Sequence, residues 1–262
     1  MAKKLFMILL MGVTTFLVAQ TIAPKKCNTC GKPLAQCQYK GRHPKQTPSQ
    51  NPLKQSVQKT KPASGSINHE WVDLGLPSGT KWATMNVGAS SPSDYGSYFA
   101  WGETSLKRSY AWKNLKYCLD TTGDKFSKYV TDSKYGDVDG KKELDLSDDA
   151  AYVNWGAGWC MPSDAQLEEL RKVCKWTWTR IDGHNGYKVD GLNGNSIFLP
   201  ASGHWSGSAP RLVGTRGDYW SRTLDTSRGC RAYGPGFYSS GTESCSHNRY
   251  DGQSVRAVRI SE

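Results

Sequence analysis

The sequence predicts an α+β domain over residues 67–262. The pattern contains two short helices, several short strands and long glycine-rich loops, a combination that suits an α+β domain. The 262 residues include 27 Gly, 10 Trp and 13 Tyr. This composition indicates a loop-rich fold whose core and surface both use aromatic rings. Length alone does not decide between one large domain and two small ones.

The predicted strands alternate apolar and polar residues and are bounded by turn residues. Residues 77–80, Pro-Ser-Gly-Thr, supply the clearest of these turns. The predicted strands cover 70–76, 81–88, 98–102, 176–178, 186–189 and 196–200.

The first predicted helix covers 148–155. Ser147 can cap it, acidic residues lie at its positive N-terminal end, and Gly156 ends it. These three features together favour a short helix.

The second predicted helix begins at Ser163. Gln166, three residues later, completes a capping box. Leu167, Leu170 and Cys174 then fall on one face, as a helix packed on a core requires.

Residues 1–19 have the pattern of a secretory signal. Lys3 and Lys4 precede an apolar run over 5–19, which is short for a membrane span. No cysteine directly follows the run, so a lipid anchor is not expected. We expect export to the periplasm, the cell surface or the medium, with no transmembrane span after signal cleavage.

A small cysteine-rich segment occupies 20–43. Cys27, Cys30, Cys37 and His43 have the spacing of a zinc-knuckle-like Cys3His site. Because these four ligands would fill every position around the metal, such a site would hold a structural zinc. The alternative is a disulfide in an exported protein, with the histidine uninvolved. No cofactor is expected in the main domain.

The positive charge of the chain lies outside the main domain. Residues 20–66 carry nine Lys or Arg and no acid, and with Lys3 and Lys4 they account for the whole net charge of +11. Residues 67–262 are therefore neutral, and no nucleic-acid partner is expected. Residues 44–66, rich in Pro, Lys, Gln and Ser, are expected to be a disordered basic linker.

Several motifs carry a family resemblance. Val-Asp-Leu-Gly-Leu-Pro-Ser-Gly-Thr-Lys-Trp-Ala is followed by Tyr-Phe-Ala-Trp-Gly-Glu, Trp-x-Met-Pro-Ser, Tyr-Trp-Ser and Ser-Val-Arg. With these the chain resembles the Fibrobacter succinogenes major paralogous domain across nearly all of 67–262. That family is similar to the C-type-lectin-like superfamily, so the resemblance implies a C-type-lectin-like fold. The motifs occupy 72–83, 98–103, 159–163, 219–221 and 254–256.

Calcium-dependent sugar binding is not supported by the sequence. The Glu-Pro-Asn and Trp-Asn-Asp motifs of animal lectins are missing. Asp137-x-Asp139-Gly140 is similar to part of a calcium loop, but Tyr135 stands where an EF-hand requires an acid. We interpret this stretch as a hydrophilic turn.

The resemblance also admits an enzyme, because the superfamily includes formylglycine-generating enzymes, which need a closely spaced cysteine pair. Cys230 and Cys245 are 15 residues apart. In a hairpin turning at 239–240 they would be about four residues out of register, roughly 13 Å apart. A disulfide tolerates about 7 Å between Cα atoms. The pair fits neither that enzyme motif nor an easy bridge.

No catalytic residue is predicted, since no spacing singles out a Ser-His-Asp triad. A helix from Ser163 would keep Cys160 and Cys174 roughly 16 Å apart. The expected disulfide joins Cys118 to Cys174.

Residues 224–250 have an unusual composition. They contain no Lys, Gln, Met or Trp and a single Glu, Glu243. The remaining residue types are close to the set reached from Asn codons by changing the two adenines, the signature of diversity-generating retroelements. The alternative is the Gly/Ser/Tyr-rich hairpin of an ordinary family member. Both interpretations favour recognition, because binding loops of antibodies use the same residue types.

The predicted function is therefore that of an exported ligand-binding module, with an unidentified protein or glycan on a surface as its partner. The alternatives are an enzyme related to formylglycine-generating oxidoreductases and a structural or adhesion component of the cell surface. The predicted binding face comprises Asp225, Ser227, Arg228, Arg231, Tyr233, Ser244, Ser246, His247, Arg249 and Tyr250.

Overall fold

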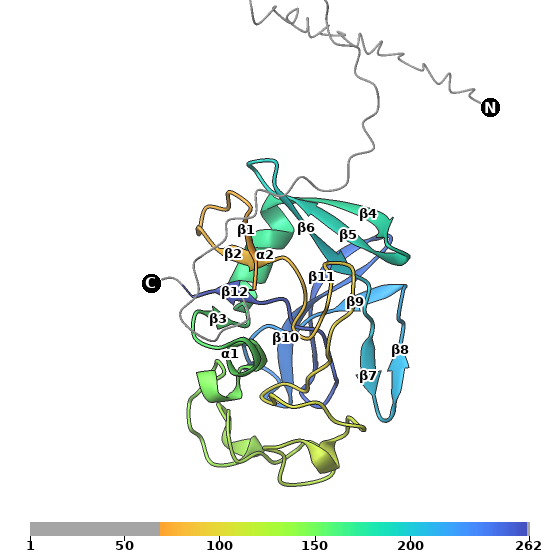
Figure 1. Ribbon diagram of the computed structural model, residues 1–262. Helices are drawn as coiled ribbons and strands as arrows, with labels where there is room; N and C mark the ends of the chain where they lie inside the picture. Colours follow the sequence, from red (N-terminus) through yellow and green to blue (C-terminus); the bar gives the residue numbers. More distant parts are fainter. Residues whose placement is uncertain (1–68, 261–262) are drawn as a thin grey trace, which may run out of the picture. The chain divides into compact units, whose positions relative to one another are not determined.

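Short antiparallel strands and two α-helices make up residues 69–260, the part of the chain that this computed structural model describes (Figure 1). The predicted α+β class is confirmed. The predictions for 1–19, 20–43 and 44–66 lie outside the described residues.

A four-stranded antiparallel sheet brings the two ends of the domain together. Val258 pairs with both Trp82 and Cys160, so the last strand lies between strands from the start and the middle of the chain. Their order in the sheet is β1 (Trp71–Asp73), β2 (Lys81–Ala83), β12 (Val258–Arg259) and β3 (Trp159–Cys160).

A second sheet and a hairpin follow the helices. β4 (Lys175–Ile181), β5 (His184–Asp190) and β6 (Ser196–Pro200) form a three-stranded meander. β7 (His204–Ser206) and β8 (Ala209–Arg211) form a separate two-stranded hairpin. The three predicted strands between 176 and 200 are thus confirmed.

The third sheet contains the segment with the unusual composition. β10 (Arg231–Tyr238) and β11 (Gly241–Asn248) form a hairpin that turns at 239–240, as predicted. β9 (Arg216–Asp218) pairs with the other edge of β10. Cys245 lies opposite Gly234, so Cys230 is four residues out of register with it, again as predicted.

The helices are α1 (Ala150–Trp155) and α2 (Asp164–Val173). The capping box at the start of α2 is confirmed. The predicted cap of α1 is wrong: Asp149, not Ser147, accepts hydrogen bonds from the first turn. Its buried carboxylate also accepts from Met161 N at 2.8 Å, which ties α1 to the start of the next segment. Residues 69–260 also contain three 3₁₀ helices: Trp112–Asn114, Ser133–Tyr135 and Leu146–Asp148.

The predicted strand at 98–102 does not form. Phe99 makes one isolated bridge to Gln253, and Trp101 N donates to Arg249 O. The stretch is buried without being part of a sheet, because its backbone pairs with an irregular segment from the C-terminal end of the chain.

Three hydrophobic clusters fill the described domain. The first surrounds Trp101 and Trp220 beneath α1. The second lies between α2 and the strands that carry Tyr187 and Phe237. The third is small and aromatic, is centred on Phe126, and lies beneath the loops between β2 and α1.

Arg256 connects two of the sheets from inside the core. Its fully buried guanidinium donates to Asn86 Oδ1 at 2.9 Å, to Ala83 O on β2 at 3.2 Å and to Phe198 O on β6 at 2.8 Å. Burial lowers the pKa of Arg256 to about 10. Every partner is neutral, so the cation is held by carbonyl dipoles alone.

Arg256→Met should lower the free energy of unfolding by about 3 kcal/mol or more, because buried carbonyls lose their donors. Urea unfolding followed by circular dichroism measures the change. Arg259→Met is the matched control, since Arg259 is only half-buried against Trp159 and its loss should cost less than about 1 kcal/mol. Equal effects of the two variants would contradict the role given to Arg256.

Candidate functional site

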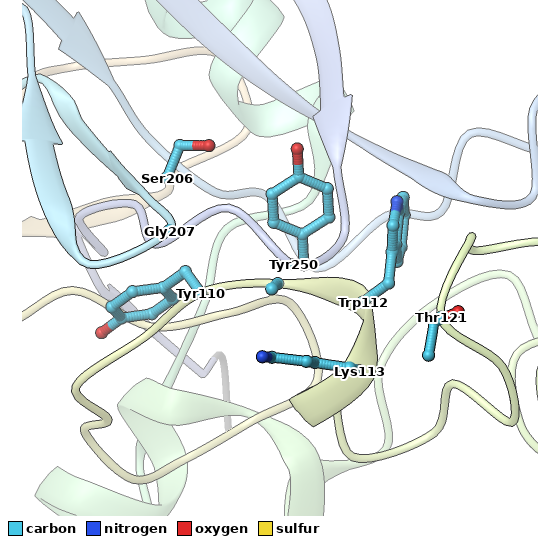
Figure 2. Close-up of a pocket in the computed structure, with 8 residues that line it drawn as sticks. Tyr110, Trp112, Lys113, Thr121, Ser206, Gly207 and Tyr250 are labelled. Carbon is cyan, nitrogen blue, oxygen red and sulfur yellow. The ribbon is translucent and has the colours of Figure 1, made fainter.

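A hollow of about 280 Å³ lies where four separate segments of the described chain meet. Figure 2 shows Tyr110, Trp112 and Lys113 from one segment; Tyr250, which follows β11, stands between Tyr110 and Trp112 in this view. The tip of the β7–β8 hairpin and Thr121 complete the lining.

Backbone pairing holds the segments of this hollow in place. Tyr110 and Gly207 exchange hydrogen bonds of 2.7 and 2.9 Å, and Trp205 and Gly252 exchange bonds of 2.8 and 2.9 Å. Gly252 is required, because a Cβ there would lie 2.6 Å from the ring of Tyr110. The aromatic wall is therefore fixed by contacts between segments far apart in sequence.

The rings of the hollow pack edge to face. Trp112 contacts Tyr250 with ring centroids 4.6 Å apart and Phe126 at 6.0 Å. The hydroxyl of Tyr110 donates to Tyr98 O at 2.6 Å, and burial raises the pKa of Tyr110. The hollow thus presents flat aromatic surfaces that are rigid and neutral.

Polar groups lie at the edge of these rings. Lys113 is exposed and makes no ion pair within residues 69–260. The hydroxyls of Ser206 and Thr121 also face the space. Such a site can stack against a flat ligand and donate hydrogen bonds around its edge.

Of the ten residues predicted for the binding face, the hollow contains only Tyr250. The sequence prediction missed Tyr110, Trp112, Lys113 and Ser206. The short pattern Tyr-x-Trp-Lys in a loop could have indicated the first three. Nothing in the sequence indicated that the β7–β8 tip would close the same space.

Five of the other predicted residues form one hydrogen-bonded cluster, which we name the Asp225 network. The carboxylate of Asp225 accepts from Ser227 at 2.6 Å and from Ser246 at 2.8 Å. Arg228 donates to the same carboxylate at 3.0 Å and to Ser246 at 2.9 Å. The Tyr233 hydroxyl approaches it to 3.4 Å. Ser227 and Arg228 are exposed at the surface of this network.

Asp225 itself is fully buried. Burial alone would raise the pKa of its carboxyl, but hydrogen bonds from Ser227, Ser246 and Arg228 outweigh it and lower the pKa. The prediction that Asp225 contacts a ligand is therefore wrong. Its role is to hold its neighbours in one geometry.

Arg249 is likewise a core residue and not part of a surface. Its guanidinium lies 4.2 Å from the ring centroid of Phe126 and 4.9 Å from that of Trp101. It donates to Lys128 O and Gly229 O at 3.1 and 3.2 Å. Burial lowers its pKa to about 10. The prediction that Arg249 binds a ligand is wrong, because the side chain is completely enclosed.

His247 lies on the opposite face of the hairpin from Ser246. Its Nε2 is 3.0 Å from Cys245 Sγ and 3.7 Å from Asp218. Asp218 also binds Arg216 at 2.6 Å and His204 at 2.9 Å. Within the described residues no group of three side chains has the arrangement of a metal site.

The remaining two predicted residues are separate. Ser244 is exposed on β11, opposite Pro235. Arg231 opens β10 and is half-buried, with its Nε unpartnered in the core. Neither belongs to the hollow or to the Asp225 network.

The predicted disulfide between Cys118 and Cys174 is not formed. Both are free thiols. Cys118 packs against the aromatic cluster around Phe126, whereas Cys174 packs against the cluster beneath α2. The two thiols therefore belong to different parts of the core.

No family model, curated protein or solved structure matches the chain. Among residues 69–260, none of the helices is long and apolar enough to cross a membrane.

Two buried groups near the hairpin respond to pH in opposite directions. Burial raises the pKa of Asp251 to about 6, against the opposing charge of His204. Burial lowers the pKa of His247 to about 4, against the opposing charge of Asp218. Between pH 4 and 6 the folded state therefore holds a proton on Asp251 that the unfolded chain releases, and lacks one on His247 that the unfolded chain binds.

Asp251→Asn should remove the pH dependence of stability that comes from Asp251 and leave the part that comes from His247. Ionisation of Asp251 destabilises the wild type as the pH rises through about 6. The free energy of unfolding of the variant minus that of the wild type should therefore be roughly 2 kcal/mol larger at pH 7 than at pH 4. Urea unfolding at the two pH values measures the gain. Asp225→Asn is the control. Because the pKa of Asp225 is lowered from 3.8, its carboxyl is ionised in the folded and the unfolded chain over most of this range, and the variant should change by less than about 0.5 kcal/mol between the two pH values. If the two variants gain equally between pH 4 and pH 7, the role given to Asp251 is contradicted.

Proposed function

We propose that this chain is an exported ligand-binding protein with a C-type-lectin-like domain, and that its ligand occupies the hollow at Trp112 and Tyr250. The observation that carries the proposal is the convergence of four segments on a rigid aromatic space with the exposed Lys113 at its edge. Loops positioned by a scaffold are where binding residues concentrate.

The exposed part of the Asp225 network is proposed as a second binding surface, which lies outside the hollow. Arg228 and Ser227 are fixed from below by a buried carboxylate. A ligand would therefore meet an arginine whose geometry is already set, which reduces the entropy lost on binding.

The chemistry of the cysteines supports recognition over catalysis. Burial raises the pKa of Cys245 to about 11, and its neighbour His247 has a pKa of about 4. The pair is a neutral thiol beside a neutral imidazole, whereas a nucleophilic cysteine needs a lowered pKa. The register of the hairpin keeps Cys230 from bridging to Cys245.

Export and zinc binding belong to the same proposal. The leader at 1–19 would direct the chain out of the cytoplasm. Cys27, Cys30, Cys37 and His43 would hold a structural zinc, with a disulfide as the alternative. Mass spectrometry of the mature protein, native and denatured, distinguishes a bound zinc ion from the loss of two hydrogens.

Trp112→Ala combined with Tyr250→Ala should abolish binding to any true ligand and lower the melting temperature by only a few degrees. The test is a screen of the mature protein against arrays of defined glycans and extracellular proteins. Tyr238→Ala is the control, because Tyr238 is a partly exposed aromatic at the other end of the hairpin. Hits that survive the double variant would contradict the proposed site.

We also propose that 224–250 is diversified by a retroelement, with an ordinary hairpin as the alternative. A template repeat matching codons 219–259, next to a reverse transcriptase gene, would distinguish the two.

Adenine mismatches between such a repeat and the gene should fall at exposed positions such as Ser227, Arg228 and Ser244. They should be missing at Ala232 and Phe237, which are fully buried. Nucleotide comparison measures this directly. Mismatches spread evenly over buried and exposed codons would contradict diversification of a surface.

A further inference from the structure

Two more hollows continue the one at Trp112. The second, of about 240 Å³, shares Tyr110 with it and is also lined by Tyr98, Lys107 and Trp205. The third, of about 540 Å³, shares Ser97 and Leu106 with the second. Linked through shared residues, the three hollows follow the segment 96–113, and we name them together the 96–113 groove. A groove built in this way suits an extended ligand with several repeating units.

We propose that the 96–113 groove binds a linear acidic oligosaccharide directly, without calcium. The inference rests on the proposed function and specifies its ligand class. Three features of the groove carry it: its aromatic surfaces, its charge, and the composition of its lining.

Aromatic rings lie in each of the three hollows. The rings of Trp112 and Tyr250 are in contact in the first hollow. In the second, the ring centroids of Tyr98 and Trp205 lie 6.2 Å apart. In the third, Trp155 is stacked with His69 at 3.9 Å. A pyranose ring has an apolar C–H face and a polar rim, so a chain of such rings can stack on successive aromatic side chains.

The charge along the groove is positive. Residues 106–116 contain four basic side chains and no acid. Lys107 pairs with Glu103 and Lys116 with Asp148, both at 2.8 Å. Arg108 and Lys113 are exposed and make no ion pair with any other residue of 69–260. Lys113 lines the first hollow, where it can pair with a carboxylate of a bound saccharide. Arg108 lines none of the three hollows, but it directly follows Lys107, which lines the second.

The lining contains no Asp or Glu in any of the three hollows. A calcium ion needs several carboxylate or carbonyl oxygens, so an anionic sugar would have to be recognised by the cations themselves. The donors at the groove, which include Lys113, Ser206 and the indole of Trp112, suit acceptor-rich hydroxyl and carboxylate groups.

An extended peptide fits the groove less well. Peptides that bind by strand addition pair with an open sheet edge. The segment 96–113 contains no strand, and the backbones of Phe99, Tyr110 and Trp205 are already paired with Gln253, Gly207 and Gly252. Main-chain groups of a peptide would find few backbone partners there.

Calorimetric titration of the mature protein with linear acidic oligosaccharides tests the proposal, at 150 mM salt with a chelator present. The probes are oligomers of galacturonic acid, of mannuronic acid and of sialic acid, and hyaluronan fragments. We expect at least one to bind, its methyl-esterified form to bind at least tenfold more weakly, and poly-glutamate not to bind.

Lys113→Glu should weaken binding of the acidic probe at least tenfold, and Trp112→Phe should weaken it less than Trp112→Ala. Lys175→Glu is the matched control, since Lys175 is an exposed lysine on β4 with no lining role, and it should leave affinity unchanged. Circular dichroism melting curves confirm that each variant is folded.

The proposal is overturned if none of the acidic probes binds, if the esters bind equally well, or if poly-glutamate competes at equal affinity. It is also overturned if Lys113→Glu and Lys175→Glu behave alike. If a neutral glycan or a protein from the arrays binds in a manner that depends on Trp112, the proposed function stands and only the acidic-saccharide assignment falls. If no array ligand depends on Trp112, both fall.

Discussion

Two buried arginines, which have no carboxylate partner among residues 69–260, determine how the C-terminal part of this domain is held. Arg256 donates to carbonyls of β2 and β6, and Arg249 donates to carbonyls of Lys128 and Gly229. Each guanidinium replaces its hydration with fixed backbone dipoles, and Arg249 adds the faces of aromatic rings. Because an arginine stays charged even when buried, the backbone around it must keep its carbonyls turned inward.

This constraint connects the core to the candidate site. Arg249 directly precedes Tyr250, and its backbone pairs with Trp101 and Cys230. The same residue contacts Phe126, whose ring supports Trp112. Fixing Arg249 therefore fixes both aromatic walls of the hollow. The proposed ligand surface is made of loops, and it is rigid because a buried cation anchors the chain beside it.

Local signals in the sequence predicted the parts of the fold that depend on near neighbours. The capping box of α2 spans four residues, and the hairpin β10–β11 closes over a two-residue turn, so the sequence predicts both. The cap of α1 was not predicted correctly, because the carboxylate of Asp149 also accepts a hydrogen bond from Met161 N, twelve residues away. A local pattern does not show that contact. The stretch 98–102 has a strand-like pattern, but its partner is an irregular segment near Gln253, and no local pattern reveals that.

The candidate site was predictable only in part for the same reason. The composition of 224–250 pointed to recognition, but composition cannot separate exposed polar residues from buried ones. Asp225 and Arg249 have the chemistry of binding residues, and the structure uses that chemistry internally. Conversely, Tyr110, Trp112 and the β7–β8 tip meet only through the pairing of Tyr110 with Gly207 and of Trp205 with Gly252. Pairings between residues so far apart in the sequence form only when the whole domain folds, so no local pattern predicts them.

The distribution of buried and exposed side chains explains how the segment 224–250 can vary in sequence while the fold stays the same. Side chains whose loss would leave a buried donor or acceptor unpaired, such as Asp225 and Arg249, cannot vary without a cost of about 1–3 kcal/mol for each unpaired group. Ser244 is exposed and carries no such cost. The hairpin can therefore change its surface while its internal hydrogen bonds, and the groove that depends on them, remain the same.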